Sequence, residues 1–149
     1  MTGDGCVLCG RAGTLAHEDP GWLLRTGHWG VSMHPAIPAP GWVAVQTLRH
    51  TEGLAALDGA EAGELGPLLA RLSAAVTRVT GSERVCTYSL GEGSPHTHVL
   101  LGPPRRDLRG AAFVTGLLRR DASLADEAAA LRVARDLAGD LATGNTPTT

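Results

Sequence analysis

The stretch Gly91-Glu92-Gly93-Ser94-Pro95-His96-Thr97-His98-Val99-Leu100-Leu101 decides how the rest of the chain is interpreted. His96 and His98 are two residues apart in a strand predicted over 96–101, so both imidazoles lie on one face of a sheet. Leu100 is the next residue on that face, and the alternate residues point into a core. The glycine-rich loop before the strand offers backbone N–H groups that can hold an anion. Two histidines beside such a loop suit chemistry at phosphorus, and a structural His pair on a solvated strand is the alternative.

The rest of the chain predicts one α+β domain. Its 149 residues, 43% hydrophobic and 19% charged, fit one packed core. Further strands are predicted over 22–26, 29–33, 42–47 and 85–90. Asp58 and Glu61 have the spacing of a capping box that begins a long helix, Pro67 marks a kink or the first turn of that helix, and Gly81 ends it. Two shorter helices are predicted near 110–120 and 124–142. We expect a single domain over 1–143 and a frayed tail over 144–149.

The charge balance excludes some partners. Thirteen basic and fifteen acidic residues give a net charge of −2, which disfavours electrostatic binding to long nucleic acid. No apolar run approaches the roughly 20 residues of a membrane span, and the polar start of the chain does not resemble a secretory signal. The sequence therefore predicts a cytoplasmic protein with no membrane partner.

The three cysteines favour a metal site over disulfides. An odd count in a cytosolic chain argues against a disulfide framework. Cys6 and Cys9 form a Cys-x-x-Cys pair, which binds a metal or acts as a redox pair. A redox pair normally opens a helix, whereas the segment 10–13, Gly-Arg-Ala-Gly, is turn-like, so metal is favoured and two further ligands are needed. Cys86 is interpreted as a small buried apolar residue.

Three segments, in the same order along the chain, resemble the histidine-triad family. Ser94–Pro103 resembles the triad motif, His-x-His-x-His followed by apolar residues. The run from Pro40 to His50 resembles the family's Pro-Gly-His-apolar segment that ends in a basic residue and His. Cys6-Val7-Leu8-Cys9 resembles the N-terminal pair of the zinc-binding members. The resemblance covers about residues 5–106. It implies a histidine-triad-like antiparallel sheet with one long helix packed on it, a homodimer, and nucleotidyl hydrolysis or transfer through a modified histidine.

The resemblance also implies a metal site and a nucleophile. In zinc-containing relatives, which include the galactose-1-phosphate uridylyltransferases, the metal ligands correspond to Cys6, Cys9, His50 and His96 here. Such a Cys₂His₂ set is a closed, structural zinc site. The middle His of the motif, His98, then corresponds to the nucleophile, with its Nδ1–H held by a backbone carbonyl and its Nε2 free to attack phosphorus.

The phosphate-binding part of the motif is present in outline. The resemblance implies that Ser94 and Gly93 hold phosphate oxygens and that Arg106, which follows the triad as in relatives, binds substrate. The third triad position departs from the family, because Leu100 replaces a His or Gln that donates a hydrogen bond.

Two further departures concern the substrate. Trp42 replaces a His and would either stack on a flat group of the ligand or pack in the core. His34 replaces the carboxylate that binds the ribose diol, and would act as an acid–base group or phosphate partner. We therefore predict a phosphoester or phosphoramidate hydrolase or nucleotidyl transferase for an atypical small phosphorylated or nucleotide-like ligand. The alternative is a catalytically impaired, zinc-stabilised binding or scaffold protein, in which Trp42 or Leu100 fills the cleft at His98.

Overall fold

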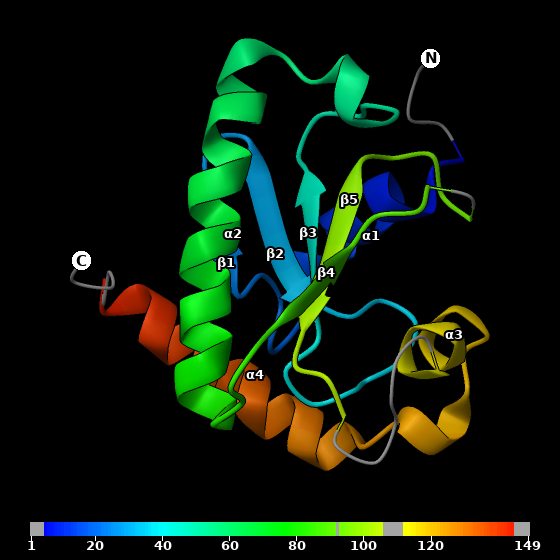
Figure 1. Ribbon diagram of the computed structural model, residues 1–149. Coiled ribbons are helices and arrows are strands. Elements are labelled where there is room, and N and C mark those ends of the chain that lie inside the picture. The colour runs from blue at the N-terminus through cyan, green and yellow to red at the C-terminus, as the bar shows by residue number, and fades with distance from the viewer. Residues whose placement is uncertain (1–4, 92, 106–111, 145–149) are drawn as a thin grey trace.

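The computed structural model describes residues 5–91, 93–105 and 112–144. Its sheet has five antiparallel strands in the order β1-β2-β3-β5-β4, which confirms the predicted α+β fold (Figure 1). The elements are α1 (Val7–Leu15), β1 (Leu24–Arg25), β2 (Trp29–Met33), β3 (Val43–Thr47), α2 (Gly59–Thr80), β4 (Cys86–Tyr88), β5 (His98–Gly102), α3 (Ala112–Leu118) and α4 (Glu127–Ala142), with 3₁₀ turns at Leu54–Ala56 and Ala122–Leu124.

One face of the sheet packs on α2 and α4 and forms the main hydrophobic core (Figure 1). Trp29 is fully buried there, and its indole N–H donates to the carbonyl of Glu61 at 3.0 Å. The other strand residues of this core are Val31, Val43, Val45, Val99 and Leu101. They alternate with residues of the opposite face, as the period of a strand requires.

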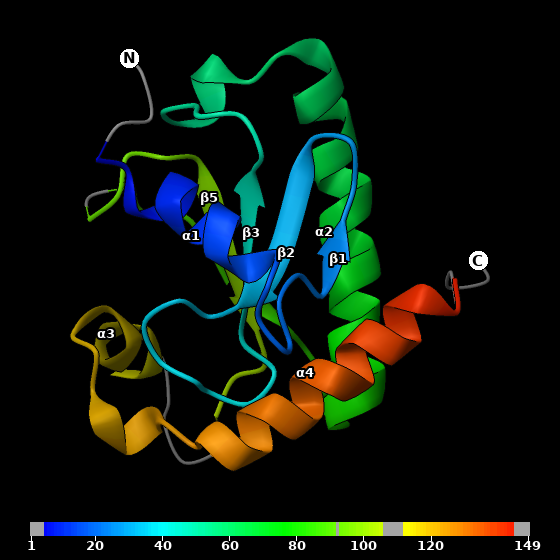
Figure 2. The same cartoon turned by 180° about the vertical axis from the view of Figure 1, so that it is seen from behind.

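The opposite face lies under α1, which crosses the central strands in Figure 2. A second apolar cluster covers the far end of this face and contains Ile37, Ala39, Trp42, Ala44, Leu100, Leu117 and Leu124. The Trp42 ring lies so close to Gly102 that an added Cβ would meet it at 2.4 Å. Glycine at 102 therefore lets Trp42 lie flat against the sheet.

The helix α1 corrects the expected turn at residues 10–13. Cys6 caps this helix by accepting a hydrogen bond from the Cys9 N–H, and Leu8 and Leu15 are buried beneath it. Gly10 and Gly13 have low helix propensity, but burial of the two leucines offsets that preference. Pro67 does not mark the start of α2 but lies inside it.

The ends of α2 confirm the sequence prediction. Asp58 accepts hydrogen bonds from two backbone amides in a capping box with Glu61, and Gly81 ends the helix with a φ of 67°. The strands are shorter than predicted at β1 and β4, and β5 begins only at His98. His96 instead forms an isolated bridge with Glu52. Within the described ranges, no helix has both the length and the apolar character needed to cross a membrane.

Candidate functional site

Two cysteines and two histidines meet where α1 approaches the sheet. The Nδ1 atom of His96 lies 3.4 Å from the Sγ atoms of both Cys6 and Cys9, and the Nδ1 atom of His50 lies 3.4 Å from Cys9 Sγ. All four ligand atoms lie within 4.8 Å of one another. In a tetrahedral site with ordinary Zn–S and Zn–N bonds, sulfur and nitrogen ligands are about 3.6 Å apart. The cluster therefore fits zinc in donor type, number and spacing.

The groups around the cluster orient its imidazoles for metal binding. The Nε2 atom of His96 lies 2.9 Å from the carbonyl oxygen of Thr47, so this nitrogen donates and Nδ1 carries the lone pair. Burial lowers the pKa of His96, which keeps the ring neutral. The Nε2 atom of His50 lies 3.3 Å from a carboxylate oxygen of Glu52 in the same way. The sequence prediction of these four residues as a metal-binding set thus agrees with their placement.

His98 is the first residue of β5, two residues after His96, and lies on the face under α1. Its Nδ1 atom lies 2.7 Å from the carbonyl oxygen of His96, so Nδ1 donates and Nε2 carries the lone pair. The side chain is half-buried, and no described residue forms a hydrogen bond with Nε2. This tautomer is the one that a nucleophilic imidazole needs.

Trp42 does not fill the space at His98. His98 pairs with Gln46 across β3 and β5, whereas Trp42 lies four residues further along, roughly 13 Å at the usual strand rise. Trp42 is 2% exposed, its indole N–H donates to the Pro103 carbonyl at 2.9 Å, and it packs with Leu100 in the second apolar cluster. Core packing is therefore the structural role of Trp42.

His34 continues the sheet one residue beyond β2 and is 6% exposed. Its Nδ1 atom accepts hydrogen bonds from the backbone N–H groups of Ala36 and Ile37, at 3.2 and 3.1 Å. The ring proton consequently lies on Nε2, which is buried and has no hydrogen-bond partner in the described residues. Burial, with smaller electrostatic contributions from His98 and Arg11, lowers the pKa of His34 to about 4. His34 is thus a neutral N–H donor on the face under α1.

Two residues on the face under α1, Gln46 and Arg11, are candidate binding residues that the sequence interpretation missed. Gln46, 1% exposed, donates from its amide nitrogen to the Leu8 carbonyl at 3.2 Å, and its Oε1 has no partner in the described ranges. A polar residue inside the apolar strand Val43–Thr47 was a signal that could have identified it. Arg11 of α1 has a buried Nε without a described partner, and nothing in its glycine-rich segment indicated this.

The remaining predicted residues are placed as follows. Ser94 is half-buried and Gly93 exposed in the loop before His96. Arg106 and the end of the predicted tail lie outside the described residues. Cys86 is half-buried against the second apolar cluster rather than fully buried.

Comparison with known proteins shows the fold. No protein-family model matches the sequence. No curated protein matches it either. Solved structures do match. A Hit-like protein from Bartonella henselae matches at a TM-score of 0.69 and 10% identity, covering 92% of this chain and 96% of that one.

Two further solved structures share the fold. A zinc-bound histidine triad family protein from Mycobacterium smegmatis matches at a TM-score of 0.66 and 14% identity, over 95% of this chain and 99% of that one. A uridylyltransferase mutant matches at 0.65 and 18% identity, over 95% of this chain and 48% of that one. This chain therefore has the histidine-triad fold, and its Cys₂His₂ cluster is a site that can hold zinc.

Proposed function

Given a histidine-triad fold with a Cys₂His₂ cluster beside His98, we propose that this protein is a hydrolase or nucleotidyl transferase that cleaves a phosphoester or phosphoramidate. The observation that carries the proposal is the 2.7 Å hydrogen bond from His98 Nδ1 to the His96 carbonyl, which leaves Nε2 as a free nucleophile. The structural match to a uridylyltransferase supports the same class of chemistry.

In the proposed reaction, the Nε2 lone pair of His98 attacks phosphorus. An N–P bond forms as the bond from phosphorus to the leaving oxygen or nitrogen breaks. Water or an acceptor hydroxyl then attacks phosphorus, the N–P bond breaks, and the attacking group releases its proton to solvent. Ser94 and Gly93 are proposed to hold phosphate oxygens, and Arg106 to bind the substrate beyond them.

Zinc at the cluster would supply structural support rather than chemistry, because four protein ligands close the coordination shell. His96 joins the cluster to the nucleophile. Its imidazole faces both cysteines, while its carbonyl fixes the tautomer of His98. The metal site is thus proposed to position His98 without touching substrate.

The leaving group receives no proton from Leu100. This residue is 8% exposed, packs with Trp42 and has no polar atom in its side chain. We propose that the enzyme therefore favours leaving groups that depart as stable anions. The same observation favours a second candidate, a zinc-stabilised protein that binds a nucleotide-like ligand without turnover.

Paired alanine variants test the roles of the two histidines. His98→Ala should abolish turnover of a nitrophenyl phosphodiester, followed by absorbance, and retain the zinc content of the wild type. His96→Ala should lose zinc and destabilise the fold. A wild-type protein that neither turns over this phosphodiester nor forms a phosphohistidine signal in ³¹P NMR would favour the binding protein. Equal zinc loss in both variants would contradict the assigned roles.

We also propose that the protein is a homodimer. The short strand β4 forms one edge of the sheet, and Leu90, just after it, is 51% exposed. Edge strands with exposed apolar neighbours favour pairing with a second chain. Analytical ultracentrifugation of the zinc-loaded protein tests this, and a monomeric mass would contradict it.

A further inference from the structure

Buried polar atoms without partners gather on one face of this protein. Within the described residues they are Arg11 Nε, His34 Nε2, Gln46 Oε1 and Tyr88 Oη. Arg11 belongs to α1, and the other three belong to the sheet face beneath α1: His34 lies opposite Trp42, Gln46 opposite His98 and Tyr88 opposite Leu100. Buried polar groups are nearly always paired in folded proteins. Their position on one face of the sheet indicates that a ligand completes some of these hydrogen bonds.

Two of these atoms are donors that share one cavity. Arg11 and His34 both line a cavity of about 230 Å³ between α1, the loop after β2 and the first turn of α4. The ring nitrogen of His34 that faces its own loop already accepts two backbone N–H bonds. The other nitrogen must therefore be an N–H donor. Arg11 is permanently charged, and its Nε is also an N–H donor.

We propose that Arg11 and His34 bind an oxyanion group of the ligand, either a carboxylate or a phosphoryl group. Two N–H donors, one of them charged, match the acceptor oxygens of an oxyanion, and bonds to a charged acceptor are the strong ones. They do not match a pair of hydroxyl groups that need an acceptor. The inference rests on the proposed function, since it describes a second part of the ligand that His98 attacks.

The charge of Arg11 supports this placement. An oxyanion between Arg11 and His34, which line the same cavity, would place a negative charge beside the permanently charged guanidinium of Arg11. It would also satisfy two buried donors that otherwise remain unpaired.

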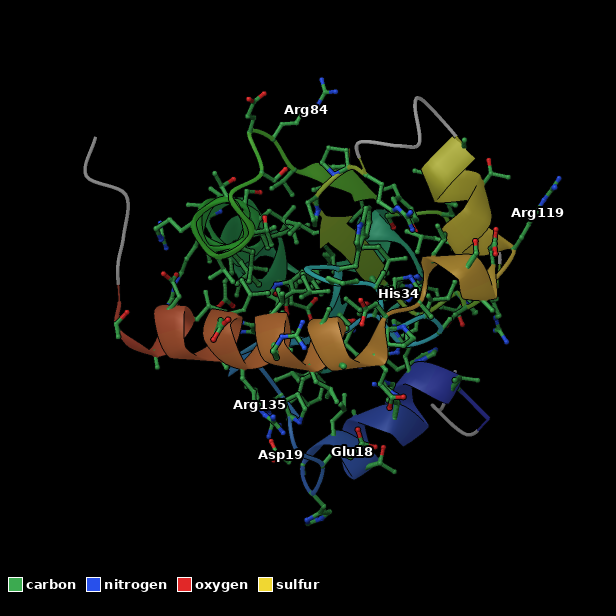
Figure 3. All side chains as sticks on the ribbon, turned by 90° about the horizontal axis from the view of Figure 1, so that it is seen from below. Glu18, Asp19, His34, Arg84, Arg119 and Arg135 are labelled. Carbon is green, nitrogen blue, oxygen red and sulfur yellow. The ribbon has the colours of Figure 1, made fainter. Side chains whose placement is uncertain are left out.

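Acidic side chains at the mouth of the cavity limit the charge of the oxyanion that can bind there. Glu18, Asp19 and Glu127 line the cavity and are exposed, and Asp19 pairs with Arg135 at 3.4 Å. Figure 3 shows Glu18 and Asp19 near the end of α1, while His34 lies deeper, beside α4. Carboxylates at the mouth repel a dianion more than a monoanion. A monoanionic group such as a carboxylate therefore fits better than a phosphate dianion.

The test uses acetate and inorganic phosphate as probes on the zinc-loaded protein at pH 8, against sodium chloride of equal ionic strength. Binding is followed by the backbone amide signals of Ala36 and Ile37 and by the ¹⁵N signals of His34. We expect saturable shifts with an oxyanion and none with chloride. Tighter binding of acetate assigns a carboxylate, and tighter binding of phosphate assigns a phosphoryl group.

Two variants and one control tie the binding to the two donors. Arg11→Met removes one donor. His34→Asn removes the other but keeps an acceptor for the Ala36 and Ile37 amides. Each should weaken the probe about tenfold or more, the loss expected for one charge-assisted bond. Arg84→Met is the matched control, because Arg84 is exposed and projects away from the cavity in Figure 3.

Absence of saturable shifts with both probes overturns the inference, as does equal weakening by Arg84→Met. A His34 proton found on Nδ1 overturns it as well. Zinc content and thermal unfolding of each variant show whether it is folded. Because no readout depends on turnover, the oxyanion site can fail while the chemistry at His98 stands, and the reverse also holds.

Discussion

The two faces of the sheet are built from the same strands, but they differ in whether their buried polar atoms have hydrogen-bond partners. On the face under α2 and α4, Trp29 is fully buried and the only polar atom of its side chain is bonded to Glu61. On the face under α1, buried donors and acceptors of Arg11, His34 and Gln46 lack partners among the described residues. Satisfied polar atoms and apolar contacts stabilise the fold, whereas unsatisfied ones lower its stability. The comparison indicates that the second face gives up stability for ligand binding.

The largest expected effect on stability comes from the metal centre, because its four ligands join the start of α1 to the sheet face beneath it. Cys9→Ser removes one of four ligands, so zinc should be lost and the free energy of unfolding should fall by several kcal/mol, since metal binding contributes directly to folding. Denaturant titration with parallel metal analysis measures both. Cys86→Ser is the matched control, a half-buried cysteine outside the cluster, and should retain zinc. A wild-type protein without bound zinc, or equal destabilisation by both variants, would contradict a structural metal.

The four metal-binding residues on the face under α1 could be predicted from sequence because short motifs contain them. Cys6 and Cys9 are one helical turn apart, and His50 and His96 lie near the ends of neighbouring strands. The ring orientation of His98 followed from the resemblance and agrees with the hydrogen bond to His96. These features depend on local spacing and strand order, which a sequence carries.

The cavity lined by Arg11 and His34 could not be predicted in the same way. Arg11 approaches His34 only because α1 packs across the sheet, and its glycine-rich segment indicated a turn. The helix forms there because Leu8 and Leu15 are buried, which is a tertiary effect that outweighs propensity. The tautomer of His34 depends on the loop at Ala36 and Ile37, whose path a sequence does not specify.

The buried His34 provides a second, smaller test through pH. Its folded pKa of about 4 lies below the ordinary value of 6.5, so the unfolded chain takes up the proton first as the pH falls. The neutral ring stabilises the fold fully above pH 6.5, and this contribution disappears as the pH falls toward 4. The difference of about 2.5 between the two pKa values corresponds to at most about 3 kcal/mol. The difference in unfolding free energy between the wild type and His34→Asn should change by this amount between pH 7 and 4.

This measurement needs a buffer free of carboxylate and phosphate, since a bound oxyanion would favour protonated His34. Urea titrations at each pH supply the free energies. A difference that stays constant across the range would show that His34 is not buried in the way described. It would also weaken the contrast between the two faces.

The smallest expected effect concerns Leu100, which belongs to the second apolar cluster on the face under α1. We expect slow turnover of adenosine phosphoramidate by the wild type, because Leu100 gives no proton to the leaving group and His34 offers a donor where a ribose diol needs an acceptor. Leu100→His restores one polar group, but it places an imidazole against Trp42 and Ala44 in an apolar cluster, which costs stability. The gain in kcat/KM, followed by ³¹P NMR, should be about tenfold at most, or roughly 1.4 kcal/mol. Leu100→Met controls for packing, since it conserves volume without adding a donor. Rapid turnover by the wild type would show that the departures at positions 34 and 100 do not restrict the substrate, and a gain far above tenfold would assign the restriction to Leu100 alone.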